Sequence, residues 1–294
     1  MVSNYIRKRD SRAEHGASRD LSFPPLPEPI AAGIYDNHAH LEIVDGDDPI
    51  DHLEQLDRAA AVGVRGVIQV GGDLESSRWS VQLADADPRV RAAVAIHPNE
   101  APAYEAAGTL DAAIAEIDEL AAHPRVVAIG ETGLDFFRTE ASGLDAQYRS
   151  FERHIAIAKR RDLAMQIHDR DAHDEVIATL QRVGAPERTV FHCFSGDAAM
   201  ARIAAEHGWY LSFAGTVTFK NAGNLREALA VIPRERILVE TDAPFLTPMP
   251  YRGRPNSPYL VLHTLRFIAG FLGVDDEQLA AEVSANTERV YGAW

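Results

Sequence analysis

The stretch that decides the fold is Gly33-Ile34-Tyr35-Asp36-Asn37-His38-Ala39-His40, an apolar run that ends abruptly in two histidines. Such a run is typical of a buried strand whose carboxyl end reaches a reaction centre. Residues two apart in an extended strand project from the same face, so His38 and His40 can bind one cation together. Asp36 shares that face and can orient a ligand. We therefore predict a first strand near 34–38 that ends at a metal site.

Four further apolar runs along the chain end in the same way. They finish at Gly130-Glu131-Thr132-Gly133-Leu134-Asp135, Gln166-Ile167-His168, Phe191-His192-Cys193-Phe194-Ser195-Gly196 and Glu240-Thr241-Asp242-Ala243-Pro244. Taken singly, a buried His is usually a hydrogen-bonded core residue, and Glu131 could equally be a helix N-terminal charge or a salt-bridge partner. Five such endings in one chain make a catalytic metal site the leading hypothesis. We expect its ligands to be His38, His40, Glu131, His168, His192 and Asp242.

Strand-like and helix-like segments alternate from Ile34 onward. Further strands are predicted near 64–71, 90–96, 125–130, 163–168, 187–192, 208–213 and 236–241. Helices are predicted near 109–122, 144–161, 198–207 (with Asp197 as N-cap), 258–271 and 275–291. Eight strand–helix units indicate an α/β fold, a (β/α)8 TIM barrel, which places catalytic residues at the carboxyl ends of its strands. A doubly wound sheet competes, but it needs a Gly-rich loop after the first strand, where this chain has His38-Ala39-His40.

The length of 294 residues, of which 46% are hydrophobic, is sufficient for one such barrel with a sizeable core. Residues 1–30 are polar and then Pro-rich, and we expect them to form an arm that is disordered or wraps the surface. Residues 31–294 are expected to form a single catalytic domain. We expect the only cysteine, Cys193, to be a small core residue and not a ligand.

The formal net charge of −15 argues against a broad nucleic-acid-binding surface. It does not exclude a small phosphate site in which divalent cations supply the positive charge, so any contact with nucleic acid should be confined to a strand end or a lesion. Residues 1–30 contain no apolar h-region and no apolar stretch reaches transmembrane length, so we expect neither a signal peptide nor a membrane span. We expect a cytoplasmic protein without a membrane partner, and we favour a monomer.

The five segments resemble motifs of the TatD family of metal-dependent deoxyribonucleases, within the barrel-fold metallohydrolase superfamily. The resemblance extends from about Ile34 to the C-terminus and includes Ser212-Phe213-Ala214-Gly215 and Phe219-Lys220-Asn221-Ala222. It implies a two-metal hydrolase that releases nucleotides from the 3′ end of DNA, a 3′–5′ exonuclease. One ion would take His38, His40, Glu131 and Asp242, and the other would take Glu131, His168 and His192, with Glu131 as the bridge.

Two departures from the family pattern concern substrate specificity more than metal binding. The family often has a second His after His97-Pro98, where this chain has Asn99, so that position is not expected to be a ligand. In the basic loop at 252–258, Ser257 stands where the family usually has Glu.

The expected chemistry is phosphodiester hydrolysis by a water that two divalent ions (Mg²⁺, Mn²⁺ or Zn²⁺) acidify, with Asp242 and Glu131 as catalytic residues. Asp242 could also take the proton of the attacking water. Phosphate contacts are expected from Arg170, Lys220, Asn221, Arg252 and Arg254, although Arg170 could instead pair with a nearby carboxylate. Aromatic side chains that could stack a base, or pack in the core, are Tyr104, Phe136, Phe137 and Phe219.

Other functions fit the same set of ligands. A small-molecule amidohydrolase or lactonase would direct the activated water at a carbonyl carbon, and an aminoacyl-tRNA deacylase would direct it at an ester. A metal-loaded scaffold without activity is disfavoured, because structural metal sites are saturated by protein ligands, whereas this set leaves positions open. The basic residues expected at the mouth favour an anionic substrate.

Overall fold

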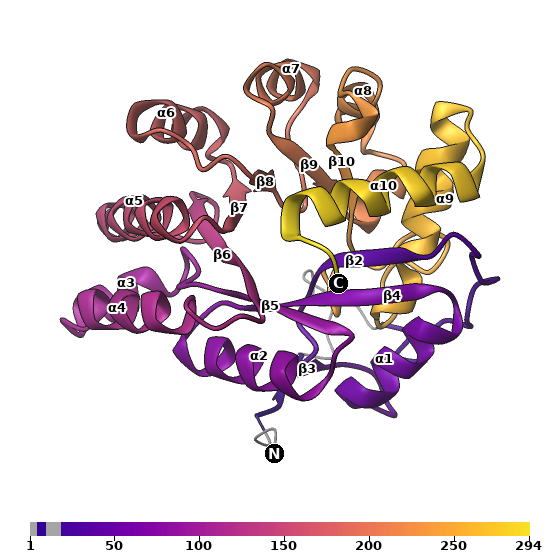
Figure 1. Ribbon diagram of the computed structural model, residues 1–294, viewed down its shortest axis with the longest axis horizontal. Coiled ribbons are helices and arrows are strands. Elements are labelled where there is room, and N and C mark those ends of the chain that lie inside the picture. Colours follow the sequence, from indigo (N-terminus) through magenta and orange to yellow (C-terminus); the bar gives the residue numbers. More distant parts are fainter. Residues whose placement is uncertain (1–4, 10–18) are drawn as a thin grey trace.

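Eight parallel strands form the centre of the computed structural model, which describes residues 5–9 and 19–294 (Figure 1). The strands are β2 (Ile34–Ala39), β4 (Val64–Gly71), β5 (Val90–Val94), β6 (Val126–Asp135), β7 (Ala164–Arg170), β8 (Thr189–Phe191), β9 (Tyr210–Phe213) and β10 (Ile237–Val239). Each pairs in parallel with the strand before and after it in this order, and the sheet curves into a nearly closed barrel. The predicted (β/α)8 barrel is confirmed.

The barrel closes where β10 meets β2. Ala39 and Ala243 form a parallel bridge there. The Asp242 N–H donates to the His38 carbonyl at 2.9 Å, and the His40 N–H donates to the Ala243 carbonyl at 2.8 Å. These bonds bring the ends of the first and last strands together, as the predicted fold requires.

Ten helices of the described residues surround the sheet (Figure 1). They are α1 (His52–Ala61), α2 (Leu74–Ala86), α3 (Ala101–Ala106), α4 (Leu110–Leu120), α5 (Leu144–Arg161), α6 (His173–Val183), α7 (Ala198–His207), α8 (Gly223–Leu229), α9 (Val261–Leu272) and α10 (Asp276–Tyr291). Helices α5 and α7 have the predicted bounds, and the Asp197 carboxylate caps α7 by accepting from the N–H groups of Ala199 and Met200. The predicted helix 258–271 begins instead with a 3₁₀ turn, η4 (Pro258–Leu260). Further 3₁₀ turns are η1 (Ala141–Gly143), η2 (Gly215–Thr218) and η3 (Arg234–Arg236).

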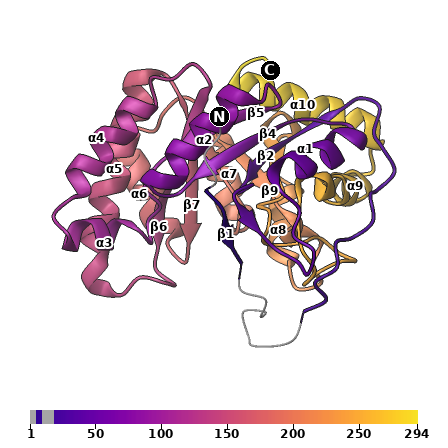
Figure 2. The ribbon, with the colours of Figure 1, turned by 90° about the horizontal axis from the view of Figure 1, so that it is seen from below.

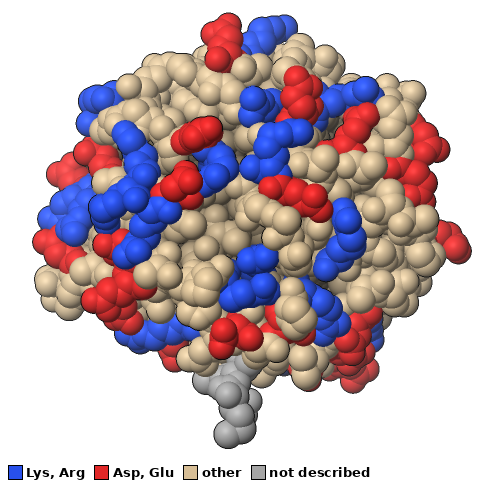
Figure 3. All heavy atoms as spheres, in the orientation of Figure 1, with Lys and Arg blue, Asp and Glu red and all other residues tan. Residues whose placement is uncertain are grey.

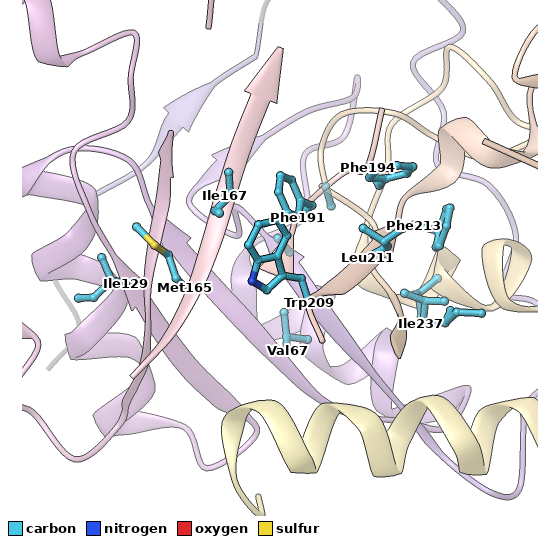
Figure 4. Close-up of a cluster of buried hydrophobic side chains, with 14 of the residues drawn as sticks. Val67, Ile129, Met165, Ile167, Phe191, Phe194, Trp209, Leu211, Phe213 and Ile237 are labelled. Carbon is cyan, nitrogen blue, oxygen red and sulfur yellow. The ribbon is translucent and has the colours of Figure 1, made fainter. Parts of the chain in front are cut away.

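The strands are apolar on both faces, because helices cover the sheet outside and side chains fill it inside. The larger core lies between sheet and helices, and Figure 4 shows part of it, with Phe191, Leu211 and Phe213 from β8 and β9 packed together. A smaller cluster comes from the opposite strand faces, such as Ile68 of β4, and packs against Tyr291 of α10. On the face seen in Figure 3, basic and acidic side chains are interspersed.

The described part of the N-terminal segment lies against the barrel. Strand β1 (Arg7–Lys8) pairs in parallel with β3 (Ile43–Val44), and Figure 2 shows β1 near the middle of the view, with α10 along the upper edge. Further along, the Tyr259 hydroxyl donates to the Pro24 carbonyl at 2.6 Å. Residues 1–4 and 10–18 of the predicted arm lie outside the described residues, and the division at residue 30 stays a prediction. No helix in the described parts of the chain is long and apolar enough to cross a membrane.

Candidate metal centre

A first cluster of ligand atoms lies at the seam between β2 and β10. Asp242 Oδ1 is 3.9 Å from His38 Nε2 and 3.6 Å from His40 Nε2. Glu131 Oε2, from β6, approaches the same two nitrogens at 3.6 and 3.8 Å. Two imidazoles and two carboxylates, from three strands distant in sequence, therefore face one point.

The spacing of these atoms fits a divalent cation. Metal–ligand bonds of about 2.0–2.2 Å place neighbouring ligand atoms roughly 3–4 Å apart around the ion. His38 is fully buried, and neither of its ring nitrogens has a hydrogen-bond partner. A buried imidazole without a partner is costly, and coordination would satisfy it. The geometry thus suits a metal ion better than direct hydrogen bonds between the side chains.

A second cluster gathers on the other oxygen of Glu131. Oε1 lies 2.5 Å from His168 Nδ1, 2.9 Å from His192 Nε2 and 3.3 Å from His97 Nε2. Burial alone would raise the pKa of Glu131, but the surrounding imidazoles hold it well below its ordinary value. The carboxylate is therefore ionised, with one oxygen toward each cluster, as a bridging ligand would need.

Carboxylates behind the histidines fix the orientation of the rings. Glu240 accepts from His192 Nδ1 at 2.9 Å and from the Cys193 N–H at 2.7 Å. Asp135 Oδ2 lies 3.1 Å from His168 Nε2, which leaves Nδ1 to face Glu131. Partners of this kind set the tautomer and position of ligating histidines. Asp135 belongs to the same sequence motif as Glu131, but its role in orienting His168 was not predicted.

Local backbone geometry at the strand ends directs the side chains into the site. Asp242 and Cys193 both have left-handed backbones, with φ of 54° and 42°. Such conformations in residues other than Gly concentrate at functional sites. The Asp36 carboxylate accepts from the Thr241 N–H at 2.9 Å and from the Thr241 hydroxyl at 2.5 Å. It therefore helps to hold the turn that carries Asp242.

His97 is the residue of this centre that sequence analysis missed. It directly follows Ala95-Ile96, the apolar continuation of β5 (Val90–Val94), and so obeys the same rule that identified the other ligands. Asn99, two residues on, donates to Asp135 Oδ2 at 3.1 Å.

The expectation that Cys193 packs in the core was wrong: it is partly exposed, because β8 ends at Phe191 and the chain turns there.

The basic residues expected to bind substrate have different surroundings. The Arg170 guanidinium lies 4.0 Å from the Phe137 ring centroid, and that of Arg252 lies 4.2 Å from the Phe219 ring centroid. Lys220 and Asn221 are exposed after β9. Tyr104 and Phe136 are partly buried against the core.

Arg254 differs from the other expected phosphate contacts. Its guanidinium donates to the carbonyls of Ser22 and Phe23, at 3.0 Å each. It also lies 3.3 Å from Asp20 Oδ2. In this structure it therefore holds the segment before the barrel, and its expected contact with substrate has no support from the geometry.

Residues 35–292 match the family described as TatD related DNase. The chain belongs to this family. It is 44% identical over 263 residues to a protein of Mycobacterium tuberculosis named "Uncharacterized metal-dependent hydrolase TatD", with 88% of this chain and 98% of the relative covered. It is 37% identical over 248 residues to the "3′-5′ ssDNA/RNA exonuclease TatD" of Citrobacter rodentium, with 82% and 92% covered.

Solved structures of the family have the same architecture. A TatD homologue from Escherichia coli superimposes with a TM-score of 0.78 at 26% identity, over 89% of this chain and 98% of that one. The predicted membership of the family is confirmed, and the chain is a metal-dependent hydrolase with candidate clusters of metal ligands.

Proposed function

We propose that this hydrolase is a deoxyribonuclease that removes nucleotides from the 3′ ends of DNA. The observation that carries the proposal is the Glu131 carboxylate, whose two oxygens face two separate groups of imidazoles. That arrangement is what a pair of metal ions about 3.5–4 Å apart needs in an enzyme that cleaves phosphodiesters. The exonuclease name of the Citrobacter rodentium relative supports the same class of substrate.

The residues that would hold the ions form two groups. We assign His38, His40, Glu131 and Asp242 to one ion, and Glu131, His168 and His192 to the other, with His97 beside it. The ligand atoms that lie within 4.8 Å of one another form three overlapping sets: His38, His40 and Asp242; His38, Glu131 and His192; and His97, Glu131 and His168. Bound divalent ions, Mg²⁺, Mn²⁺ or Zn²⁺, supply an acidified water and neutralise charge on the phosphate.

Asp242 is the candidate for proton transfer. Its side chain is 14% exposed against 6% for Glu131, so of the two carboxylates it is the more accessible to solvent. A carboxylate at that place can accept a proton from the water that attacks phosphorus. Glu131, which is surrounded by imidazoles, would instead bridge the two ions and fix the distance between them.

Aromatic and basic side chains at the strand ends suit a single strand of nucleic acid. Arg170 lies against Phe137, which is 62% exposed, and Arg252 lies against Phe219. Bases stack on exposed aromatic rings, and guanidinium groups bind phosphates. Lys220 and Asn221 would add contacts to the non-scissile phosphates. A 3′ end threaded between these pairs would place its last phosphodiester at the centre.

The test is digestion of a 5′-labelled single-stranded oligonucleotide with each of the three metals. We expect a ladder that shortens from the 3′ end, and we expect a 3′-phosphorothioate linkage to slow it. Double-stranded DNA, RNA, a charged tRNA, and a panel of amides and lactones serve as competing substrates. His38→Ala is the matched inactive variant. Metal-dependent turnover of an amide or a lactone without cleavage of DNA would overturn the proposal.

A further inference from the structure

The segment Tyr5–Arg9 lies outside the part of the chain that matches the family, which begins at residue 35. Its backbone is nevertheless tied to the loop that follows the first barrel strand. The Arg7 N–H donates to the Glu42 carbonyl at 2.8 Å, and the Arg9 N–H donates to the Val44 carbonyl at 3.0 Å. Because Glu42 is two residues after His40, the segment is fixed beside the ligands at the seam.

The side chain of Arg9 reaches the loop that carries Asp242. Its Nη1 donates to the Pro244 carbonyl at 2.5 Å, and its guanidinium carbon is 4.8 Å from the Phe245 ring centroid. The Phe245 ring lies 6.2 Å from the His40 ring. One aromatic side chain therefore separates this guanidinium from a proposed metal ligand. Arg9 keeps 20% of its side-chain surface exposed, so it remains accessible at the mouth.

Within the described residues, the carboxylate that forms an ion pair with Arg9 is Asp45, and Arg9 shares it with a second guanidinium. Asp45 Oδ2 lies 3.3 Å from Arg9 Nη1, but the same carboxylate also binds Arg19 in a bidentate pair. Arg19 and Asp45 are each only 2% exposed, whereas Arg9 is ten times more open. Arg19 also donates from Nε to the Gly253 carbonyl at 2.9 Å, next to Arg252. Two guanidinium groups, those of Arg9 and Arg19, thus share the Asp45 carboxylate beside the centre.

We propose that Arg9 is a substrate-binding residue that contacts a non-scissile phosphate of the strand held at the metal centre. The inference rests on the proposed function. An enzyme that removes the 3′-terminal nucleotide leaves the rest of the strand on the 5′ side, and that part must leave the centre along the mouth. A guanidinium fixed at the rim, with part of its surface open, can donate to a phosphate there. The segment before the barrel would then extend the substrate site beyond the family core.

The test compares Arg9→Gln and Arg9→Lys with the wild type. Arg182→Gln is the matched control, because Arg182 pairs with Glu152 on the outer helices at 2.6 Å. The measurements are KM and kcat on oligonucleotides of two, five and ten residues, and the dependence of KM on salt. Melting temperatures show whether each variant is folded, and Arg9→Lys keeps the test usable if Arg9→Gln does not fold.

We expect Arg9→Gln to raise KM for the longest strand about tenfold, since hydrogen bonds to charged groups are the strong ones. The rise should be smaller for the dinucleotide, kcat should change less than KM, and the slope of log KM against log salt should fall by about 0.7. Arg9→Lys should be intermediate. DNA cleavage by the wild type, with Arg9→Gln indistinguishable from Arg182→Gln, would overturn this inference alone. A wild type that cleaves no DNA would overturn the proposed function and this inference with it.

Discussion

At the residue scale, the orientation of each imidazole decides whether a metal ion can be held. His192 presents Nε2 to Glu131 because Glu240 accepts from its Nδ1, and Glu240 also accepts from the Ser212 hydroxyl at 2.5 Å. Glu240→Gln keeps the shape and an oxygen that can accept from Nδ1, but it removes the negative charge that makes the ring a stronger metal ligand. We expect metal affinity to fall about 10–100-fold, measured by isothermal titration with Mn²⁺ or Zn²⁺. Glu54→Gln on the exposed face of α1 is the control. Equal affinities for the two variants would contradict this role.

His154 is a second buried imidazole, and it belongs to stability and not to the metal centre. Its Nδ1 donates to the Ser150 carbonyl at 2.7 Å, and its Nε2 accepts from the Ile96 N–H at 3.2 Å. Burial lowers the pKa of His154 to about 4 from the ordinary value of 6.5. The neutral ring is therefore the folded form, because protonation would break the bond from Ile96.

The pH dependence follows from the sign of that shift. Stability from His154 is fully present above pH 6.5 and is lost as the pH falls toward about 4, where the folded form also titrates. The expected loss is about 1 kcal/mol per pH unit across this window. Urea unfolding at pH 7.5 and 5 measures it. His154→Gln should be less stable at pH 7.5 but lose less on acidification, and parallel losses in both proteins would refute the assignment.

At the scale of elements, β6 shows what sequence could and could not predict. The run Val126–Ile129 was recognised as a strand, but pairing with β7 resumes after an irregularity and continues from Thr132 to Asp135. Two glycines in Gly130-Glu131-Thr132-Gly133 indicate a turn by local preference, so only the neighbouring strand explains the extension. The metal ligands that directly follow a clear apolar run, such as His168 and His192, could be predicted from the sequence. His97 follows an apolar run in the same way as His192 does, so the same rule could have identified it.

The packing of β6 on β7 makes a prediction at Gly133. Its φ is +149°, and a Cβ built there would lie 2.0 Å from the carbonyl oxygen of His168. Gly133→Ala should therefore lower the free energy of unfolding by about 3 kcal/mol and displace a metal ligand. Gly223→Ala at the start of α8 is the matched control, because no atom lies within 4 Å of its added Cβ. Thermal and urea unfolding compare the two variants. Equal stability would show that β6 and β7 can move apart at Gly133 without any loss in the free energy of unfolding.

At the scale of the whole molecule, the centre joins strands from both ends of the chain. His38 comes from β2 and Asp242 follows β10, and Glu131 lies between them in the sequence. The ligands come together only when the barrel is folded, so metal ions should bind the folded barrel and not the unfolded chain. The barrel should then be more stable when the centre is loaded.

The size of that stabilisation follows from mass action. At a free metal concentration one hundred times the dissociation constant, the gain is about 2.7 kcal/mol, or a rise of roughly 5 °C in melting temperature for a chain of this size. Removal of metal with a chelator should lower the melting temperature, and addition of Mn²⁺ or Zn²⁺ should restore it. The double variant His38→Ala with Asp242→Ala removes ligands from both ends of the chain and should lose most of the shift. If the shift persists unchanged in that variant, the stabilising ion binds elsewhere, and the seam between β2 and β10 is not the metal centre.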